Sequence, residues 1–167
     1  RVLFRSTASR VCAAGDRSNV LLMGSFAVGL GSAVAWSFLG DPAEHSQFEP
    51  AVGYVAGSLV NLGLMQVVKT HAQRPRPFTQ NPTYTGADCG TLRDDCWSFF
   101  SGHTSNTAFN LFYAASAYDL YGPDTQKPGA AALAYTLAGV GTIAVGSARV
   151  AAGWHYWSDV AVGALVG

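Results

Sequence analysis

The sequence predicts an all-α fold, a transmembrane helical bundle. Charged residues make up only 12% of the 167 residues, about half of the roughly 25% usual in soluble domains. Hydrophobic residues make up 49%. Every charge falls within five short stretches, 1–17, 41–49, 69–96, 119–127 and 149–159. The helices of a soluble bundle would instead carry a charged stripe along their outer faces.

The charge-free runs between these stretches are the expected membrane helices. They are Ser18–Gly40, Pro50–Val68, Trp97–Tyr118 and Pro128–Ala148, of 23, 19, 22 and 21 residues. A helix that crosses a bilayer needs about 20 mostly apolar residues. Small residues scattered through the runs suit close helix contacts in lipid, as in the segment Gly53–Gly57, which has small-xxx-small spacing.

The length fits one domain, residues 1–167, which we expect to be part of a longer protein truncated at both ends. Arg1 is not an initiator Met, and the last run, Val160–Gly167, stops after eight residues. High hydrophobicity excludes a disordered chain. Equal numbers of basic and acidic residues, ten each, exclude a basic nucleic-acid binder.

Four spans place alternate linkers on opposite sides of the membrane. Stretches 1–17, 69–96 and 149–159 then share one side, which we call the site face. Nine of the ten basic residues fall there, and the opposite side has only Lys127. The basic residues of the site face are Arg1, Arg5, Arg10, Arg17, Lys69, Arg74, Arg76, Arg93 and Arg149.

The second run ends in a cationic segment, residues 69–77. Pro75 and Pro77 each lack an N–H and restrict the residue before them, so a helix does not continue through them. We expect Lys69 at a helix end and Arg76 folded back towards it from an extended segment. Alone, the segment also fits a basic flank at the membrane edge.

The third run opens with Ser101-Gly102-His103. A Ser-Gly pair at a helix start offers a hydroxyl and unpaired backbone N–H groups to an anion, and the helix dipole adds to the attraction. His103 lies beside this cradle with a proton to donate. The alternative is an ordinary helix cap with a solvated histidine.

The fourth run leads to Arg149, then His155 and Asp159. The last two are four residues apart, so on a helix the carboxylate meets one imidazole nitrogen and fixes the tautomer. A histidine held in this way is a nucleophile or a base. The alternative is a histidine among the aromatic residues of the membrane interface.

Together the three segments predict phosphoryl chemistry, because parity places them at one face. The cations Lys69, Arg76 and Arg149 would offset charge on non-bridging oxygens. One histidine would attack the phosphorus atom, and the other would protonate the leaving oxygen.

In this order and spacing, the segments resemble the three-part signature of the type 2 phosphatidic acid phosphatase and vanadium haloperoxidase superfamily. Six residues separate Lys69 from Arg76-Pro77, and five and three residues separate Arg149, His155 and Asp159. The resemblance spans 69–159 and is to the membrane lipid phosphatase branch. It implies the helical core of the acid phosphatases and vanadium haloperoxidases.

The resemblance also implies a role for each residue. His155 would be the nucleophile that forms a phosphohistidine, Asp159 its orienting partner, and His103 the general acid for the departing alcohol. The residues that would hold the phosphoryl group are Lys69, Arg76, Ser101, Gly102 and Arg149.

Two positions depart from the family pattern. Phe100 stands where Pro is usual before Ser-Gly-His, and Ala148 stands where Ser is usual before Arg149. Neither departure removes a group from proton or phosphoryl transfer. We expect an altered pocket shape or weaker oxygen binding rather than an inactive protein.

A metal site is the competing use of the four His and three Cys. Six residues separate Cys89 from Cys96, rather than the two to four of common zinc knuckles, and Glu44 and Glu49 lie on the opposite face. We expect no metal and no cofactor, because three cations neutralise the phosphate. Cys89 and Cys96 either form a disulfide, if the site face is oxidising, or stay reduced, and Cys12 remains unpaired.

Charge bias and resemblance disagree on orientation. Without Lys69, Arg76 and Arg149, six basic residues remain on the site face against one opposite, which favours a cytoplasmic site. The resemblance implies the reverse, since most bacterial lipid phosphatases of this group act on the outer leaflet. We expect an integral protein of a bacterial inner membrane with an extracytoplasmic active site.

Three functions fit these observations to different degrees. The first is a metal-independent phosphatase acting on a phospholipid or polyprenyl phosphate or diphosphate, with no nucleic-acid partner. The alternative is a vanadate-dependent haloperoxidase, with vanadate as its cofactor, but known members of that branch are larger and soluble. A protein that binds anionic lipid without turnover is the third and least favoured function. Passive binding needs no oriented nucleophile, and the sequence contains the full set of His155, Asp159 and His103. The pattern names neither one substrate nor an oligomeric state.

Overall fold

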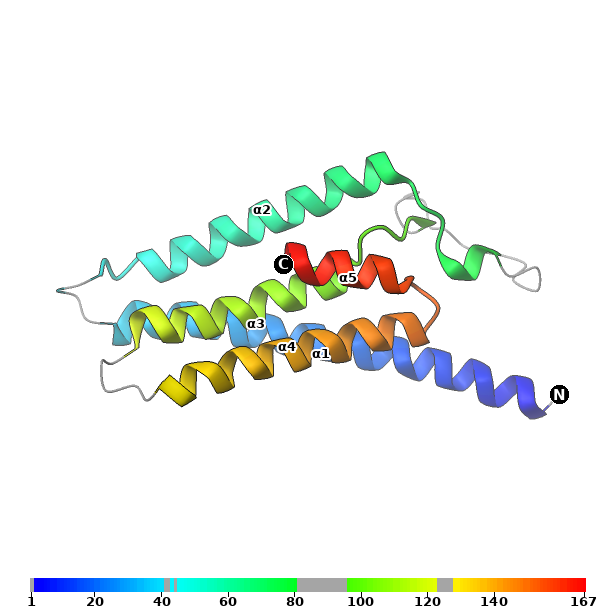
Figure 1. Cartoon of the computed structure of the whole chain (residues 1–167), viewed down its shortest axis with the longest axis horizontal. Helices are drawn as coiled ribbons and strands as arrows, with labels where there is room; N and C mark the ends of the chain where they lie inside the picture. Colours follow the sequence, from blue (N-terminus) through cyan, green and yellow to red (C-terminus); the bar gives the residue numbers. More distant parts are fainter. Residues whose placement is uncertain (1, 41–42, 44, 81–95, 123–127) are drawn as a thin grey trace.

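The computed structural model describes residues 2–40, 43, 45–80, 96–122 and 128–167, and the regular structure within these ranges is entirely helical (Figure 1). An isolated antiparallel bridge joins Pro75 to Trp97. The predicted all-α class is confirmed. The elements are α1 (Val2–Leu39), α2 (Glu49–Ala72), the 3-10 helix η1 (Pro77–Gln80), α3 (Gly102–Tyr121), α4 (Pro128–Ala151) and α5 (Trp157–Val166).

Three helical segments are long and apolar enough to cross a membrane. They are Ala13–Leu39 in α1, Glu49–Ala72, which is α2, and Gly129–Ala151 in α4. Large apolar side chains lie on their outer surfaces, such as Leu59, which is 65% exposed, and Ile143, which is 66% exposed. Such surfaces suit hydrocarbon rather than water. The chain is an integral membrane protein, as predicted.

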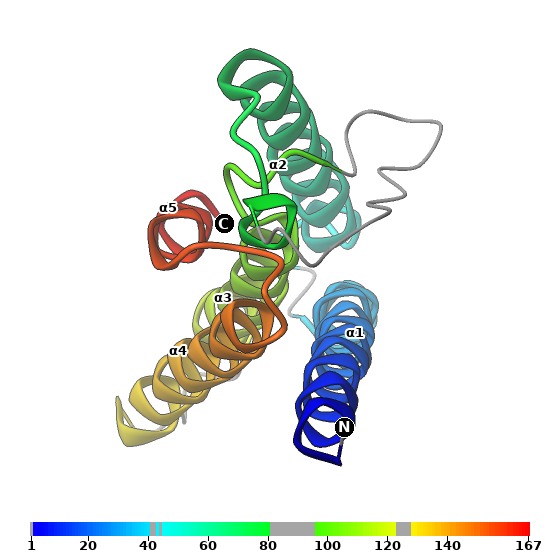
Figure 2. The ribbon, with the colours of Figure 1, turned by 90° about the vertical axis from the view of Figure 1, so that its right-hand side faces the viewer.

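The third predicted span, Trp97–Tyr118, corresponds to α3, which is less apolar than these segments and is not among them. Its Ser, Thr and Asn side chains face inward, and Thr104, Ser105 and Asn110 are fully buried. The helix contacts α1, α2, α4 and α5 and lies between them in the view along the bundle (Figure 2). The other helices therefore shield the polar side chains of α3 from lipid.

The first predicted helix boundary, Ser18, is wrong. Helix α1 begins at Val2 and runs for 38 residues, so the stretch 1–17 extends this helix and is not a linker. The stretch contains no Pro and one Gly, Gly15, and is otherwise rich in Arg, Ala and Ser. Charge in this stretch sets a limit to the apolar run but does not end the helix, because Arg has a high helix propensity.

Helix α2 ends before Pro75, as the two prolines predict. Gln73 takes a left-handed conformation with φ of 44°, and its N–H donates to the carbonyl of Lys69 at 3.1 Å. This cap closes the last turn of the helix. Lys69 therefore lies in the last turn, and the chain leaves the helix towards Arg76.

The helix ends gather at two ends of the bundle (Figure 1). The C-terminal ends of α2 and α4 and the N-terminal ends of α3 and α5 lie at one end, which we call the site end, and the C-terminal ends of α1 and α3 lie at the other. Parity predicts this grouping. Helix α5 then turns back along α3 and α4, which it contacts.

Close approaches to α3 depend on glycine. A Cβ at Gly57 of α2 would lie 2.6 Å from the ring of Phe109, so the predicted small-xxx-small segment does pack against α3. A Cβ at Gly163 of α5 would lie 2.7 Å from the carbonyl oxygen of Ser101. That carbonyl already accepts the N–H of Ser105 at 3.0 Å, so it does not move freely.

We expect Gly163→Ala to lower the midpoint of thermal unfolding in detergent by several degrees, because overpacking costs about 1–3 kcal/mol. Gly139→Ala in α4 is the matched control, since a Cβ at Gly139 meets nothing within 4 Å. Equal midpoints for the two variants would contradict the close packing of α5 on α3.

Candidate active site

A pocket of about 440 Å³ lies at the site end. Six of the eight predicted site residues line it, and the other two, Ser101 and Asp159, lie behind its wall and are fully buried. Five further residues line the pocket that sequence reasoning did not assign to the site: Asn19, Leu22, Met65, Asn106 and Trp154. The six predicted residues are Lys69, Arg76, Gly102, His103, Arg149 and His155.

Three cations meet in this pocket from three parts of the chain. Lys69 and Arg149 come from the last turns of α2 and α4, and Arg76 comes from the segment after α2. The two guanidinium carbons lie 4.9 Å (Arg76) and 5.0 Å (Arg149) from the ring centroid of Trp154, within cation–π range. None of the described residues that line the pocket is acidic. The pocket therefore attracts an anion.

Arg149 has unused hydrogen-bonding capacity. It is only 6% exposed, and its Nη1 donates to the Ser18 hydroxyl at 3.4 Å. Its Nε is buried without a hydrogen-bond partner in the part of the chain that the structure describes. An unpartnered buried donor costs on the order of 1–3 kcal/mol, so an oxygen that accepted this N–H would be stabilised.

Ser101 caps α3. Its hydroxyl accepts the N–H of Thr104 at 3.4 Å and the hydroxyl of Thr104 at 2.9 Å. Its backbone N–H donates to the carbonyl of Asp159 at 3.0 Å, which joins the start of α3 to α5. The Ser101 hydroxyl thus faces its own helix and does not line the pocket.

The next two residues of α3 do line the pocket. A Cβ at Gly102 would lie 2.3 Å from the sulfur of Met65, so any larger residue requires Met65 to move. Nε2 of His103 lies 2.8 Å from the side-chain oxygen of Asn19 in α1. Backbone N–H groups in the first turn of a helix have no partner within the helix, so this end of α3 is suited to an anion.

His155 lies in the α4–α5 turn and is 3% exposed. Its Nδ1 lies 2.8 Å from the carbonyl oxygen of Ser98. A carbonyl oxygen only accepts hydrogen bonds, so Nδ1 carries the proton and the neutral ring has its lone pair on Nε2. The backbone of residue 98 therefore sets the tautomer of His155.

The surroundings of His155 favour the neutral ring. Burial lowers the pKa of His155 below its usual value, and the positive charges of Arg149 and Arg76 act in the same direction. Asp159 acts in the opposite direction without reversing the shift. At neutral pH the imidazole is therefore uncharged, which is the state that a nucleophile requires.

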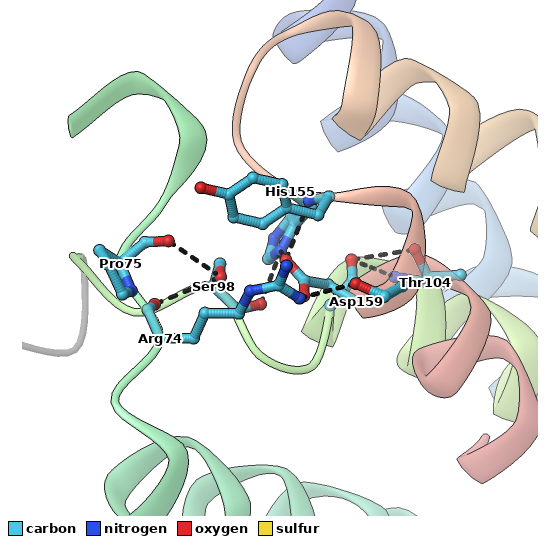
Figure 3. Close-up of polar contacts among 9 residues, drawn as sticks. Arg74, Pro75, Ser98, Thr104, His155 and Asp159 are labelled. Atoms are coloured by element: carbon cyan, nitrogen blue, oxygen red, sulfur yellow. Dashed lines mark hydrogen bonds and ion pairs between the residues drawn. The ribbon is translucent and has the colours of Figure 1, made fainter. Parts of the chain in front are cut away.

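Asp159 lies near His155, as the four-residue spacing predicts, but the distance from Nδ1 to Oδ2 is 3.7 Å, longer than a hydrogen bond. The carboxylate is held by other groups. Oδ2 accepts the N–H of Tyr156 at 2.9 Å, and Oδ1 accepts Nη1 of Arg74 at 2.6 Å (Figure 3). Nδ1 of His155 is therefore hydrogen-bonded to the carbonyl of Ser98, and the carboxylate of Asp159 lies near it without a hydrogen bond.

Sequence reasoning left Arg74 out of the catalytic site and gave it a role only in a basic membrane flank or in passive lipid binding. Nη1 of Arg74 also donates to the Ser158 hydroxyl at 2.6 Å, and the guanidinium lies 4.0 Å from the ring centroid of Tyr156. The alternation of Arg and Pro in residues 74–77 contained an indication of this position. Residues i and i+2 of an extended segment point to the same side, so Arg74 is expected on the side of Arg76. The carbonyl of Ser98 had no comparable signal, since every residue has one.

The cysteine and metal expectations are tested only in part. Cys96 is disulfide-bonded, and its carbonyl accepts the N–H of Arg76 at 3.1 Å. Cys89, the predicted partner, and Glu44 lie outside the described residues. Within the described ranges, no three His, Cys, Asp or Glu side chains lie close enough to hold a metal ion. The absence of a metal and a cofactor stays a prediction.

Comparison with known proteins identifies the family. The family model of the PAP2 superfamily matches residues 50–167, which include all three motifs. A crystal structure of a transmembrane PAP2-type phosphatidylglycerolphosphate phosphatase from Bacillus subtilis has a similar fold, with a TM-score of 0.60, 20% sequence identity, and coverage of 99% of this chain and 83% of that one. No curated protein matches this chain in sequence. The chain therefore belongs to the PAP2 superfamily.

Proposed function

We propose that this protein is a phosphatase that hydrolyses a lipid phosphate or diphosphate through a phosphohistidine, without a metal ion. The observation that carries the proposal is the state of His155, whose Nδ1 proton is engaged by the Ser98 carbonyl while the ring lines a pocket with three cations. Membership of the PAP2 superfamily supports the reaction class.

In the first step, Nε2 of His155 attacks phosphorus. The N–P bond forms as the P–O bond to the lipid alcohol breaks, and protonated His103 donates its proton to the leaving oxygen. The phosphoryl group brings negative charge to the pocket, which favours the protonated form of His103. The three cations offset charge on the non-bridging oxygens, each contact contributing about 1.5–3 kcal/mol.

In the second step, water attacks the phosphohistidine and gives a proton to His103. The N–P bond breaks, phosphate leaves, and His155 returns to its neutral form. Between the two steps the phosphorylated imidazole keeps its Nδ1 proton and is positively charged. The carboxylate of Asp159, 3.7 Å from Nδ1, then stabilises this charge.

The membrane setting supports a lipid substrate. Apolar surfaces of α1 and α2 lie beside the pocket, so acyl chains can stay in the bilayer while the phosphate enters the site. The structural relative from Bacillus subtilis is a phosphatidylglycerolphosphate phosphatase, which favours a phospholipid monoester here. Phosphatidic acid and polyprenyl diphosphates present similar phosphoryl groups and belong in the same substrate panel.

We expect the purified protein to release phosphate from at least one member of this panel with a chelator present. His155→Ala should lower kcat by on the order of 10³-fold or more, because no other group forms the covalent intermediate. His71→Ala is the matched control, since His71 is exposed near the same end of the bundle and, among the described residues, hydrogen-bonds with Thr70 and Val67 of its own helix. Equal rates for wild type and His155→Ala, or loss of activity on chelation, would contradict the proposal.

We place the site end on the extracytoplasmic face of a bacterial inner membrane. The disulfide at Cys96 supports this orientation, because disulfides persist in oxidising compartments. The surplus of basic residues on the site face opposes it, and the disulfide is given more weight because it depends directly on the compartment.

Cysteine labelling tests this orientation. In a Cys12→Ser background, a membrane-impermeant maleimide should label Gln80→Cys in intact cells, because Gln80 is exposed in η1 at the site end. Gln47→Cys, exposed near the start of α2 at the other end, should react only after lysis. The reverse pattern would show a cytoplasmic site.

A further inference from the structure

We infer that Arg74, which lies within the first motif but at none of its signature positions, is a positioning residue for His155. The inference rests on the proposed function. Arg74 is anchored through its side chain to Asp159 and through its carbonyl to Ser98, the two neighbours of Nδ1 (Figure 3). It acts through these groups and does not line the pocket.

The side chain of Arg74 fixes the start of α5. One guanidinium nitrogen, Nη1, reaches both Oδ1 of Asp159 and the hydroxyl of Ser158 at 2.6 Å, and the guanidinium plane lies over Tyr156. These partners all lie within the four residues that follow His155 in the chain. Asp159 is fully buried, so removal of Arg74 leaves its carboxylate without this charged partner, while the N–H of Tyr156 still donates to Oδ2.

The backbone of Arg74 fixes Ser98. The carbonyl of Arg74 accepts the N–H of Ser98 at 2.8 Å and the hydroxyl of Ser98 at 3.2 Å. The carbonyl of Ser98 in turn accepts the Nδ1 proton of His155 at 2.8 Å. A closed ring of contacts results, which runs from the Arg74 side chain through Asp159, His155 and Ser98 to the Arg74 backbone. Loss of the Arg74 side chain breaks this closed set of contacts between Arg74 and Asp159.

The charge on Arg74 also balances the charge on Asp159. The groups that face His155 are Asp159 from α5, Arg149 from α4 and Arg76 from the segment after α2, with His103 and Lys69 in the walls of the same pocket. Of these only Asp159 favours a protonated ring. Without Arg74, the carboxylate acts on His155 with its charge uncompensated, so protonation of the ring becomes easier.

The test compares Arg74→Gln, Arg74→Lys and Arg17→Gln in the full chain. We expect Arg74→Gln to lower kcat by about 10- to 100-fold, the range found when a residue that orients a metal ligand through a hydrogen bond is replaced. KM should change less than about 3-fold, because Arg74 does not line the pocket. The acid limb of kcat/KM against pH should move to higher pH. Arg17→Gln, which removes an equal charge from an exposed position near the same end, should match wild type.

Arg74→Lys keeps the positive charge but loses the planar guanidinium group. We expect the acid limb of its kcat/KM profile to stay near that of wild type, and its kcat to fall less than that of Arg74→Gln. This variant also serves if Arg74→Gln does not fold. The inference is wrong if the acid limb of Arg74→Gln coincides with that of wild type, or if Arg17→Gln moves it as far.

A measurement on the resting protein separates this inference from the proposed function. Nitrogen NMR of labelled histidine reads the tautomer and titration of His155 without substrate. We expect the wild-type ring to carry its proton on Nδ1 and to titrate at lower pH than the ring in Arg74→Gln. If wild type released no phosphate, the proposed function would fail, while the NMR titration would still decide whether Arg74 acts on His155.

Discussion

A hydrogen bond of 2.8 Å between Nδ1 of His155 and the carbonyl of Ser98 joins two segments that lie 57 residues apart, and the site is arranged around it. Ser98 is held from behind by the backbone of Arg74, and His155 precedes a helix whose first turn is tied to the Arg74 side chain. The same turn of α5 accepts the N–H of Ser101 and so fixes the start of α3. The bond from Ser101 to Asp159 thus couples the segment that carries the candidate nucleophile to the helix that carries His103.

The membrane explains why polar groups are concentrated in α3. A polar group exposed to hydrocarbon costs several kcal/mol, so the polar side chains of a membrane helix must meet each other. Here Asn61 of α2 donates to Asn106 at 3.0 Å and accepts from Ser105, and Tyr54 donates to Asn110 at 2.6 Å. These bonds fix α2 against the centre of the bundle. Lys69, at the end of α2, is thereby held beside the pocket.

The sequence predicted the architecture where a pattern of charge was enough. Charge-free runs located the helices, and parity brought the three motifs to one end. The start of α1 was missed because Arg and Ala continue a helix as readily as apolar residues do. The sequence located side chains that the structure brings to the pocket, as at Lys69 and His155. It did not locate the backbone carbonyl of Ser98, which contacts His155, or the side chain of Arg74, which contacts Asp159. The inward rotation of the Ser101 hydroxyl depends on Thr104, whose contact the motif does not encode.

In the proposed reaction, Nε2 of His155 attacks phosphorus before water does. The stereochemical course at a chirally labelled phosphoryl group tests it most directly, because two in-line displacements restore the starting configuration and one inverts it. We expect retention of configuration in the released phosphate. Inversion would mean that water attacks the substrate directly, and it would contradict the assignment of His155 as the nucleophile.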